Sequence, residues 1–240
     1  PQVSPAAPQA TPAASASAPV ASGCPGAGQP PQATVAASYA TALAFAPDGR
    51  LFYTERSGTI RVWQDGQAVA FASVPTVTTE ALGAYSERGL LGLAISPGFA
   101  RDHFVYAFYS DANRSTQRVV RLTDDCHGRG TGEATIVSGL PAGPDCCHKG
   151  GRLAFGPDGD LYITLGETHV AAAAQDMCDP RGKILRYTPD GQPAPGNLCG
   201  PVYAYGLRNP FGIAFAPDGR LFVTNNGPSG DAGSPGSGYD

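Results

Sequence analysis

LAFGPDGDLYITLGE, residues 153–167, joins an apolar run to a Pro-Asp-Gly turn and then to a second run of alternating side chains. A turn of this composition between two β-rich runs is typical of a β-hairpin. Similar phrases are LAFAPDGRLFYTE at 43–55, LAISPGFARDHFVYAFYS at 93–110 and IAFAPDGRLFVTNNG at 213–227. The phrase recurs at intervals of 50, 60 and 60 residues, measured at the residue two before each proline: Phe45, Ile95, Phe155 and Phe215.

Further β-rich runs separate the copies of this phrase, at 59–63, 118–122 and 183–187. No stretch keeps a helical apolar period over three turns, apart from a weak cluster at 171–174. A repeat of this kind indicates stacked four-stranded units, because each unit buries its apolar face only against the next one. The sequence therefore predicts an all-β protein, a β-propeller of four-stranded blades, of which this chain covers about four.

Composition supports one folded domain with a tail. The chain has 240 residues, 42% of them hydrophobic, which is enough for one core. Residues 1–34 are almost entirely Pro, Ala, Ser, Gly and Gln, so we expect a disordered tail there and the propeller domain at 35–240. The net charge of -4, with scattered Lys and Arg, argues against a nucleic-acid partner, and no apolar run reaches the roughly 18 to 20 residues of a membrane span.

Six cysteines, an even number, favour an oxidising compartment and therefore a secreted or periplasmic protein. A bond between Cys178 and Cys199 would close a loop rich in Pro and Gly. A bond between the adjacent Cys146 and Cys147 is sterically demanding, and pairing of each with another partner, such as Cys126, is the simpler alternative. Metal ligation by these cysteines is disfavoured, because no Cys-x-x-Cys pair accompanies them.

Four loop segments combine glycines with charged or polar side chains, at 86–92, 148–152, 205–212 and 225–231. In a propeller, loops from several blades converge on one face around the central channel. We therefore expect these four segments to form one site.

Together these segments resemble the soluble sugar dehydrogenases that use pyrroloquinoline quinone (PQQ), a family that includes the aldose and sorbosone dehydrogenase types. The resemblance rests on Glu-Arg-Gly-Leu-Leu-Gly, His-x-Gly-Gly-Arg-Leu, Leu-Gly-Glu, Gly-Lys-Ile-Leu-Arg, Gly-Leu-Arg-Asn-Pro and Asn-Gly-Pro, in this order, between about residues 40 and 231. It implies a six-bladed propeller, and hence that the last blades, with the basic residues that hold the carboxylates of PQQ, lie outside this chain.

The resemblance implies roles for individual residues. His148 would be the general base that takes the proton from the sugar hydroxyl, and a group that titrates near neutral pH suits this step. Glu167 would orient His148 and favour its charged form. Arg208 and Asn209 would hold the quinone oxygens, where a guanidinium stabilises negative charge.

Two further roles follow from the resemblance, together with two departures from it. The carbonyls of Gly227 and Pro228 would bind Ca²⁺, a cation that prefers oxygen ligands. Glu87 stands where the glucose-oxidising members often carry glutamine, so we expect it in the cofactor-binding set with altered sugar contacts. Cys147 precedes the histidine where Asp or Asn is usual.

The expected function is therefore sugar oxidation with PQQ and Ca²⁺, with an external electron acceptor as a further partner and a homodimer as the expected assembly. Two alternatives are a non-catalytic propeller that binds glycan or protein, and a metal-dependent lactonase on a similar propeller. The residues also allow plainer roles: His148 as a structural loop residue, Glu87 and Arg88 as a surface ion pair, and Arg152 as a strand-edge charge.

Overall fold

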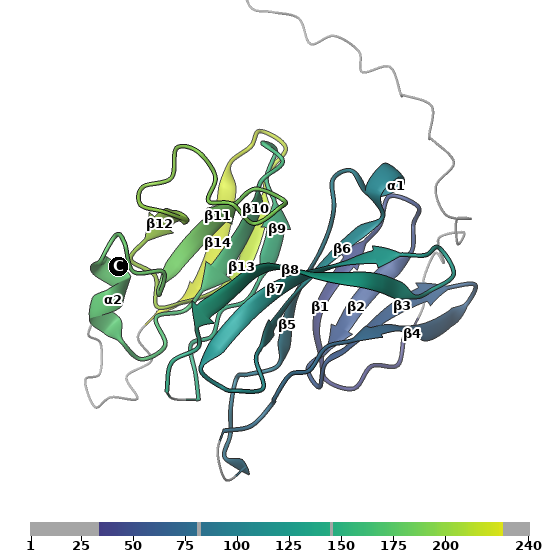
Figure 1. The fold of residues 1–240 in the computed structure, drawn as a ribbon, viewed down its shortest axis with the longest axis horizontal. Helices are drawn as coiled ribbons and strands as arrows, with labels where there is room; N and C mark the ends of the chain where they lie inside the picture. The colour runs from purple at the N-terminus through teal and green to yellow at the C-terminus, as the bar shows by residue number, and fades with distance from the viewer. Residues whose placement is uncertain (1–33, 81–82, 145, 228–240) are drawn as a thin grey trace, which may run out of the picture.

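The computed structural model describes residues 34–80, 83–144 and 146–227. Within them the chain forms three four-stranded antiparallel sheets and one two-stranded sheet, each with its strands side by side in sequence order (Figure 1). The first two sheets contain β1 (Ala40–Phe45), β2 (Leu51–Glu55), β3 (Thr59–Gln64), β4 (Gln67–Ser73), β5 (Leu90–Ile95), β6 (Phe104–Ser110), β7 (Thr116–Asp124) and β8 (Gly130–Pro141). The others contain β9 (Leu153–Phe155), β10 (Leu161–Leu165), β11 (Lys183–Tyr187), β12 (Val202–Tyr205), β13 (Asn209–Phe215) and β14 (Leu221–Asn226).

Two short helices lie in loops, α1 (Phe99–Asp102) between β5 and β6, and α2 (Ala171–Gln175) between β10 and β11. No helix in the described part of the chain is long and apolar enough to cross a membrane. The predicted tail, residues 1–34, lies outside the described residues apart from Thr34.

The Pro-Asp-Gly phrase forms the turn between the first two strands of a sheet, as predicted. In the turn between β9 and β10, the Gly156 amide donates to the Asp160 carbonyl over 2.9 Å, and the Asp158 carboxylate accepts the Asp160 amide over 3.1 Å. Gly159 has a φ of 82°, which glycine adopts without strain. The turns that follow β1 and β13 repeat these hydrogen bonds. Between β5 and β6 the loop is longer and contains α1.

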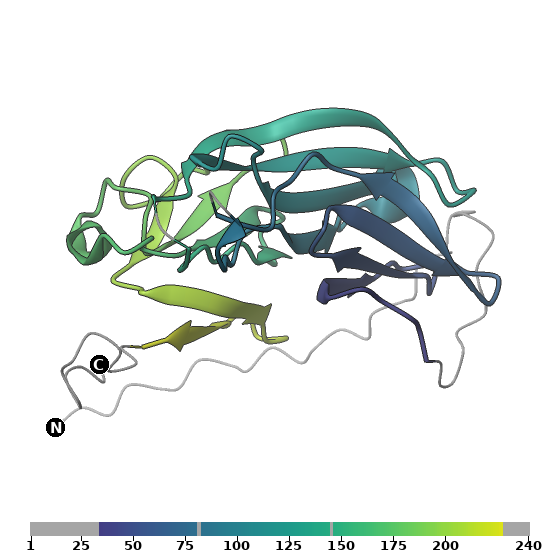
Figure 2. The ribbon, with the colours of Figure 1, turned by 90° about the horizontal axis from the view of Figure 1, so that it is seen from below.

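Successive sheets pack against one another, and the hydrophobic core lies between them. One buried cluster, which includes Phe52 and Tyr109, joins the first sheet to the second. Another, which includes Phe108 and Leu161, joins the second sheet to the third. Figure 2 shows β13 and β14 below the third sheet, and β1 along the lower edge of the first. This is the blade arrangement of a β-propeller, so the predicted fold class is confirmed.

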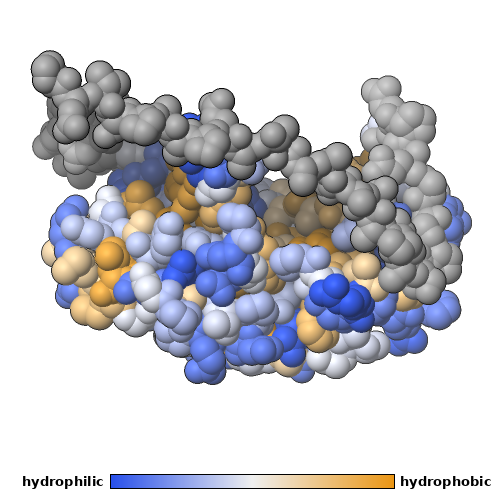
Figure 3. Space-filling model, turned by 90° about the horizontal axis from the view of Figure 1, so that it is seen from above, coloured by the Kyte–Doolittle hydropathy of each residue, from blue (hydrophilic) through white to orange (hydrophobic). Residues whose placement is uncertain are grey.

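The first strands of the four sheets line a cavity of about 630 Å³, which we call the central groove. Among its lining residues are those that occupy one equivalent position in the four copies of the repeated phrase: Leu43, Leu93, Leu153 and Ile213. Hydrophobic side chains, orange in Figure 3, gather along the upper edge of that view. Leu43 on β1, one of the lining residues, is 67% exposed. The repeat therefore places apolar side chains both in the cores between blades and along the central groove.

The disulfides confirm one predicted pairing and correct another. Cys178 is bonded to Cys199, so the loops on either side of β11 are joined. Cys146 is bonded to Cys147, and the simpler alternative, in which each pairs with a partner such as Cys126, is wrong. Cys126 is disulfide-bonded as well.

Candidate active site

His148 lies in the loop between β8 and β9, just before the first strand of the third sheet. The φ angles of His148, Gly150 and Gly151 are 58°, 63° and 96°, so three of four consecutive residues are left-handed. For a histidine this backbone costs on the order of 1 kcal/mol and persists only where contacts hold it. One such contact is the His148 amide, which donates to Glu87 Oε2 over 2.7 Å. The loop thereby fixes the imidazole at the end of β9 remote from the Pro-Asp-Gly turn.

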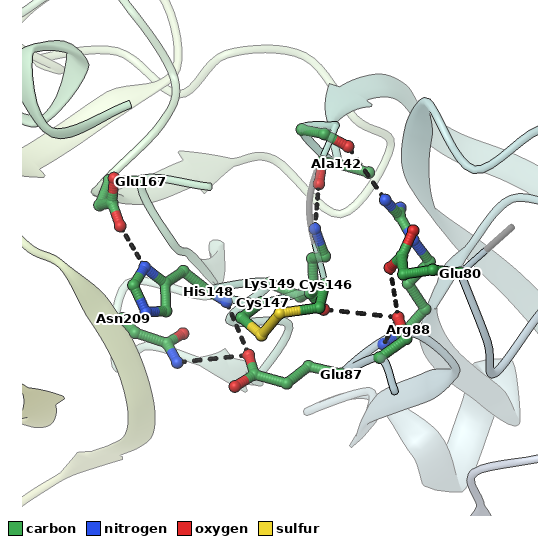
Figure 4. The surroundings of a disulfide bond; sticks show 12 residues. Glu80, Glu87, Arg88, Ala142, Cys146, Cys147, His148, Lys149, Glu167 and Asn209 are labelled. Carbon is green, nitrogen blue, oxygen red and sulfur yellow. Dashed lines mark hydrogen bonds and ion pairs between the residues drawn. A yellow bond between two sulfur atoms is a disulfide. The ribbon is translucent and has the colours of Figure 1, made fainter. Parts of the chain in front are cut away.

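The imidazole of His148 is bound through one of its two ring nitrogens (Figure 4). Nδ1 forms a hydrogen bond with Glu167 Oε1, in a pair whose members are only 7% and 4% exposed. Glu167 follows β10 and is held there by its own amide, which donates to the Arg208 carbonyl over 2.8 Å. Nε2 makes no hydrogen bond within the described residues. Glu167 therefore sets the ring orientation and leaves Nε2 able to exchange a proton.

Asn209 connects the other members of the site. Its amide and that of Arg208 both donate to Asn225 Oδ1, over 3.0 Å and 3.1 Å, which anchors the start of β13 to the end of β14. The Asn209 side chain accepts the Gly150 amide over 3.2 Å and donates to Glu87 Oε2 over 3.5 Å. The structure therefore brings Glu87, His148, Glu167, Arg208 and Asn209 together from four separate loop or strand ends.

Burial lowers the pKa of His148 below its usual 6.5, because desolvation disfavours the imidazolium. The hydrogen bond and the charge of Glu167 act in the opposite direction, whereas the positive charge of Arg208 and the nearby His169 lower the pKa further. The net shift favours the neutral imidazole, which is the state that a general base requires.

Arg88, next to Glu87 in sequence, is not part of the surface ion pair that the sequence allowed, and Lys149, next to His148, is buried as well. Arg88 is 1% exposed and pairs with Glu80 over 2.7 Å, rather than with Glu87. Lys149 is also 1% exposed and donates to the Ala142 carbonyl (Figure 4). Both side chains brace the loops that carry Glu87 and His148.

Sequence reasoning missed two residues near the site. The ring of His169 packs edge-on against His148, with 4.2 Å between the ring centroids. The Arg152 guanidinium lies in the central groove and stacks on Phe211, 4.3 Å from the ring centroid, so it is not a simple strand-edge charge. The only sequence signal for His169 was its position two residues after Glu167, which does not define a side-chain contact.

Of the two predicted calcium ligands, the structure describes only Gly227. Gly227 is half-buried and follows Asn226, whose carbonyl accepts Arg208 Nη1 over 3.3 Å. Pro228 lies outside the described residues. The Ca²⁺ site therefore stays a prediction.

The known proteins to which this chain is similar are named as sugar dehydrogenases. Residues 37–232 match the family model for glucose/sorbosone dehydrogenase. The aldose sugar dehydrogenase of Escherichia coli is 32% identical over 203 residues, which cover 79% of this chain and 54% of that protein. Quinoprotein glucose dehydrogenase B of Acinetobacter calcoaceticus is 28% identical over 226 residues, which cover 79% and 46%.

One of the similar solved structures is also a sugar dehydrogenase. The PQQ-bound aldose sugar dehydrogenase of Streptomyces coelicolor is 38% identical, with a TM-score of 0.71, and the match covers 81% of this chain and 58% of that one. The chain spans about half the length of the curated relatives that it matches. Since the family model matches well over half of the residues, this chain belongs to the glucose/sorbosone dehydrogenase family.

Proposed function

We propose that this protein oxidises the hydroxyl group of an aldose or a related sugar, with His148 as the general base. PQQ would supply the chemistry that side chains lack, because it accepts the hydride, and with it two electrons, from the sugar carbon. The observation that supports this proposal most directly is the His148 imidazole, which Glu167 orients through Nδ1 and which makes no hydrogen bond through Nε2 to any described residue.

His148 Nε2 would take the hydroxyl proton as the hydride leaves the neighbouring carbon. The lowered pKa of His148 keeps Nε2 unprotonated before this step. The Glu167 carboxylate stabilises the imidazolium that results, since its charge lies beside Nδ1. Glu167 is therefore a positioning residue that acts through His148.

Arg208 and Asn209 would hold the quinone, with Glu87 beside them. A quinone gains negative charge when it is reduced, and a guanidinium next to an amide N–H offers positive charge and hydrogen-bond donors to it. Glu87 Oε2 accepts from the His148 amide and the Asn209 side chain, so this carboxylate fixes their separation. The donor set around His148 thus fits an anionic, planar oxidant.

The remaining features of the proposal rest on the sequence resemblance to the PQQ-dependent sugar dehydrogenases and on the disulfides. Ca²⁺ would be bound by the carbonyls of Gly227 and Pro228, where a hard cation polarises the cofactor. An external acceptor would reoxidise the cofactor, and a secreted or periplasmic location fits the disulfides. The predicted homodimer is retained as part of the proposal.

The test is reconstitution of the full-length protein with PQQ and Ca²⁺, followed by dye reduction with a panel of sugars. We expect turnover in the wild-type protein and, in His148→Ala, a loss of kcat of about 100-fold or more, with quinone binding retained. Quinone binding is measured separately by absorbance. A protein that binds no quinone would contradict the proposal. Glycan binding without turnover in either form would instead favour the non-catalytic alternative.

A further inference from the structure

The Cys146–Cys147 disulfide lies directly before His148, and its residues are joined to the segment that carries Glu87 (Figure 4). The Cys146 carbonyl accepts the Glu87 amide over 2.8 Å and the Ser86 hydroxyl over 3.4 Å. In the opposite direction, the His148 amide donates to Glu87 Oε2 over 2.7 Å. Cys147 is the one residue between these two contacts, so the disulfide lies inside the connection between Glu87 and His148.

We infer that this disulfide is a positioning element of the active site, which holds the backbone that aims His148 and Glu87 at the reacting groups. The catalytic part of this inference rests on the proposed function. The part that concerns the backbone does not, because it follows from the hydrogen bonds between the two loops.

A bond between the side chains of adjacent residues closes a small ring around the peptide that joins them. Such a ring leaves few backbone conformations to Cys146 and Cys147, in the same sense that any cross-link restricts the chain that it closes. The next residue, His148, has a left-handed backbone, which persists only when its surroundings leave it little alternative. The ring supplies that restriction on the side of the loop that precedes the imidazole.

The partner segment is already held by other contacts. Glu80 accepts the Ser86 hydroxyl over 2.6 Å and Arg88 Nε over 2.7 Å, so both neighbours of Glu87 are fixed. The segment that carries Glu87 is therefore held independently of the disulfide.

The disulfide is also accessible to a small reductant, since Cys146 and Cys147 are both half-buried. With dithiothreitol as the probe, the S–S bond would break, and two electrons and two protons would pass from the dithiol to the two sulfur atoms. The dithiol would become a cyclic disulfide, and Cys146 and Cys147 would become thiols. We expect the site to loosen on reduction while the sheets persist.

The experiment compares Cys146→Ser/Cys147→Ser with a matched control, Cys178→Ser/Cys199→Ser, which removes the other described bond. Amide hydrogen exchange at Glu87 and His148 should become at least about tenfold faster in the first variant and stay unchanged in the control. With PQQ and a sugar bound, kcat should fall about 10- to 100-fold while KM changes less than about threefold. Unchanged exchange at both amides would overturn the inference.

A second measurement covers the case in which the serine variant does not fold. In Cys126→Ser/Cys178→Ser/Cys199→Ser, where Cys146–Cys147 is the remaining described disulfide, dithiothreitol should produce the same faster exchange, and an NMR titration should show the pKa of His148 rising toward its usual value as its burial is lost. Glu167, Arg208 and His169, which also act on this pKa, are unchanged by the treatment. If reduction changes neither the rate of amide exchange nor the pKa of His148, the inference is wrong. If these readouts respond but no form oxidises sugar, the proposed function fails and the positioning role stands.

Discussion

The two ring nitrogens of His148 have different surroundings, and this difference can be tested one atom at a time. Replacement of Glu167 by Gln keeps a hydrogen-bond acceptor near Nδ1 but removes the negative charge. Because that charge raises the pKa of His148, its loss should lower the pKa further and move the acid limb of the pH profile of kcat/KM to lower pH. The plateau should fall about 10- to 100-fold, since the imidazolium formed during turnover loses its counter-charge.

The measurement is the pH dependence of dye reduction in the reconstituted protein, together with an NMR titration of the imidazole without cofactor. The direction of this shift follows because the neutral imidazole is the active form, and activity falls as His148 is protonated below its pKa. An acid limb that moves to higher pH in Glu167→Gln would show that Glu167 does not stabilise the charged form of His148.

At the scale of the element, the site lies at one end of the first hairpin of a sheet and the Pro-Asp-Gly turn at the other. Gly166, at the end of β10, has no room for a side chain, because a Cβ would meet the His148 carbonyl and lie 3.1 Å from Asn209 Oδ1. Gly166→Ala should therefore displace His148, lowering stability by about 1 to 3 kcal/mol and kcat by about 10-fold or more.

Gly159→Ala is the matched control, since a Cβ there meets open space and only the φ of 82° is affected. It should cost about 1 to 2 kcal/mol and leave kcat unchanged. Urea unfolding and dye reduction measure the two effects. Equal loss of kcat in the two variants would contradict the role assigned to the close approach at Gly166.

The hairpins could be predicted from the sequence because their signals are local. The Asp158 carboxylate accepts an amide only two residues along the chain, and Gly159 follows at the position that needs a positive φ. The contacts of the site are not local: Glu87 and His148 are 61 residues apart, and Arg88 pairs with Glu80 instead of lying at the surface. The cysteine pairing was open for the same reason, since sequence spacing does not define which loops meet.

At the scale of the whole molecule, Arg152 joins all four sheets. It precedes β9, and its Nη1 donates to the Thr41 carbonyl on β1 and, over 2.6 Å, to the Leu91 carbonyl on β5. Its Nε donates to the Phe211 carbonyl on β13 over 3.2 Å. Burial lowers the pKa of Arg152, and no carboxylate pairs with it among the described residues. The guanidinium thus depends on carbonyls from three other sheets.

Arg152→Lys should lower the free energy of unfolding by about 1 to 3 kcal/mol, because a single ammonium group cannot reach carbonyls in three directions. Arg220→Lys is the control: its side chain is 71% exposed, and the change should stay within about 0.5 kcal/mol. Chemical denaturation followed by circular dichroism compares them. Equal free energies of unfolding in the two variants would contradict the role of Arg152 as a link between sheets.

The separation of the two ends of each hairpin has a practical consequence for handling the protein. The turns at 47–49, 157–159 and 217–219 all follow the first strand of their sheet, whereas His148 and Asn209 stand before or at the start of theirs. A linker grafted onto these tips would fasten the molecule to an electrode or a bead by its far end. The face that carries His148 and Asn209 would then stay open to the surrounding liquid, and the three tips offer alternative anchoring points in the same orientation.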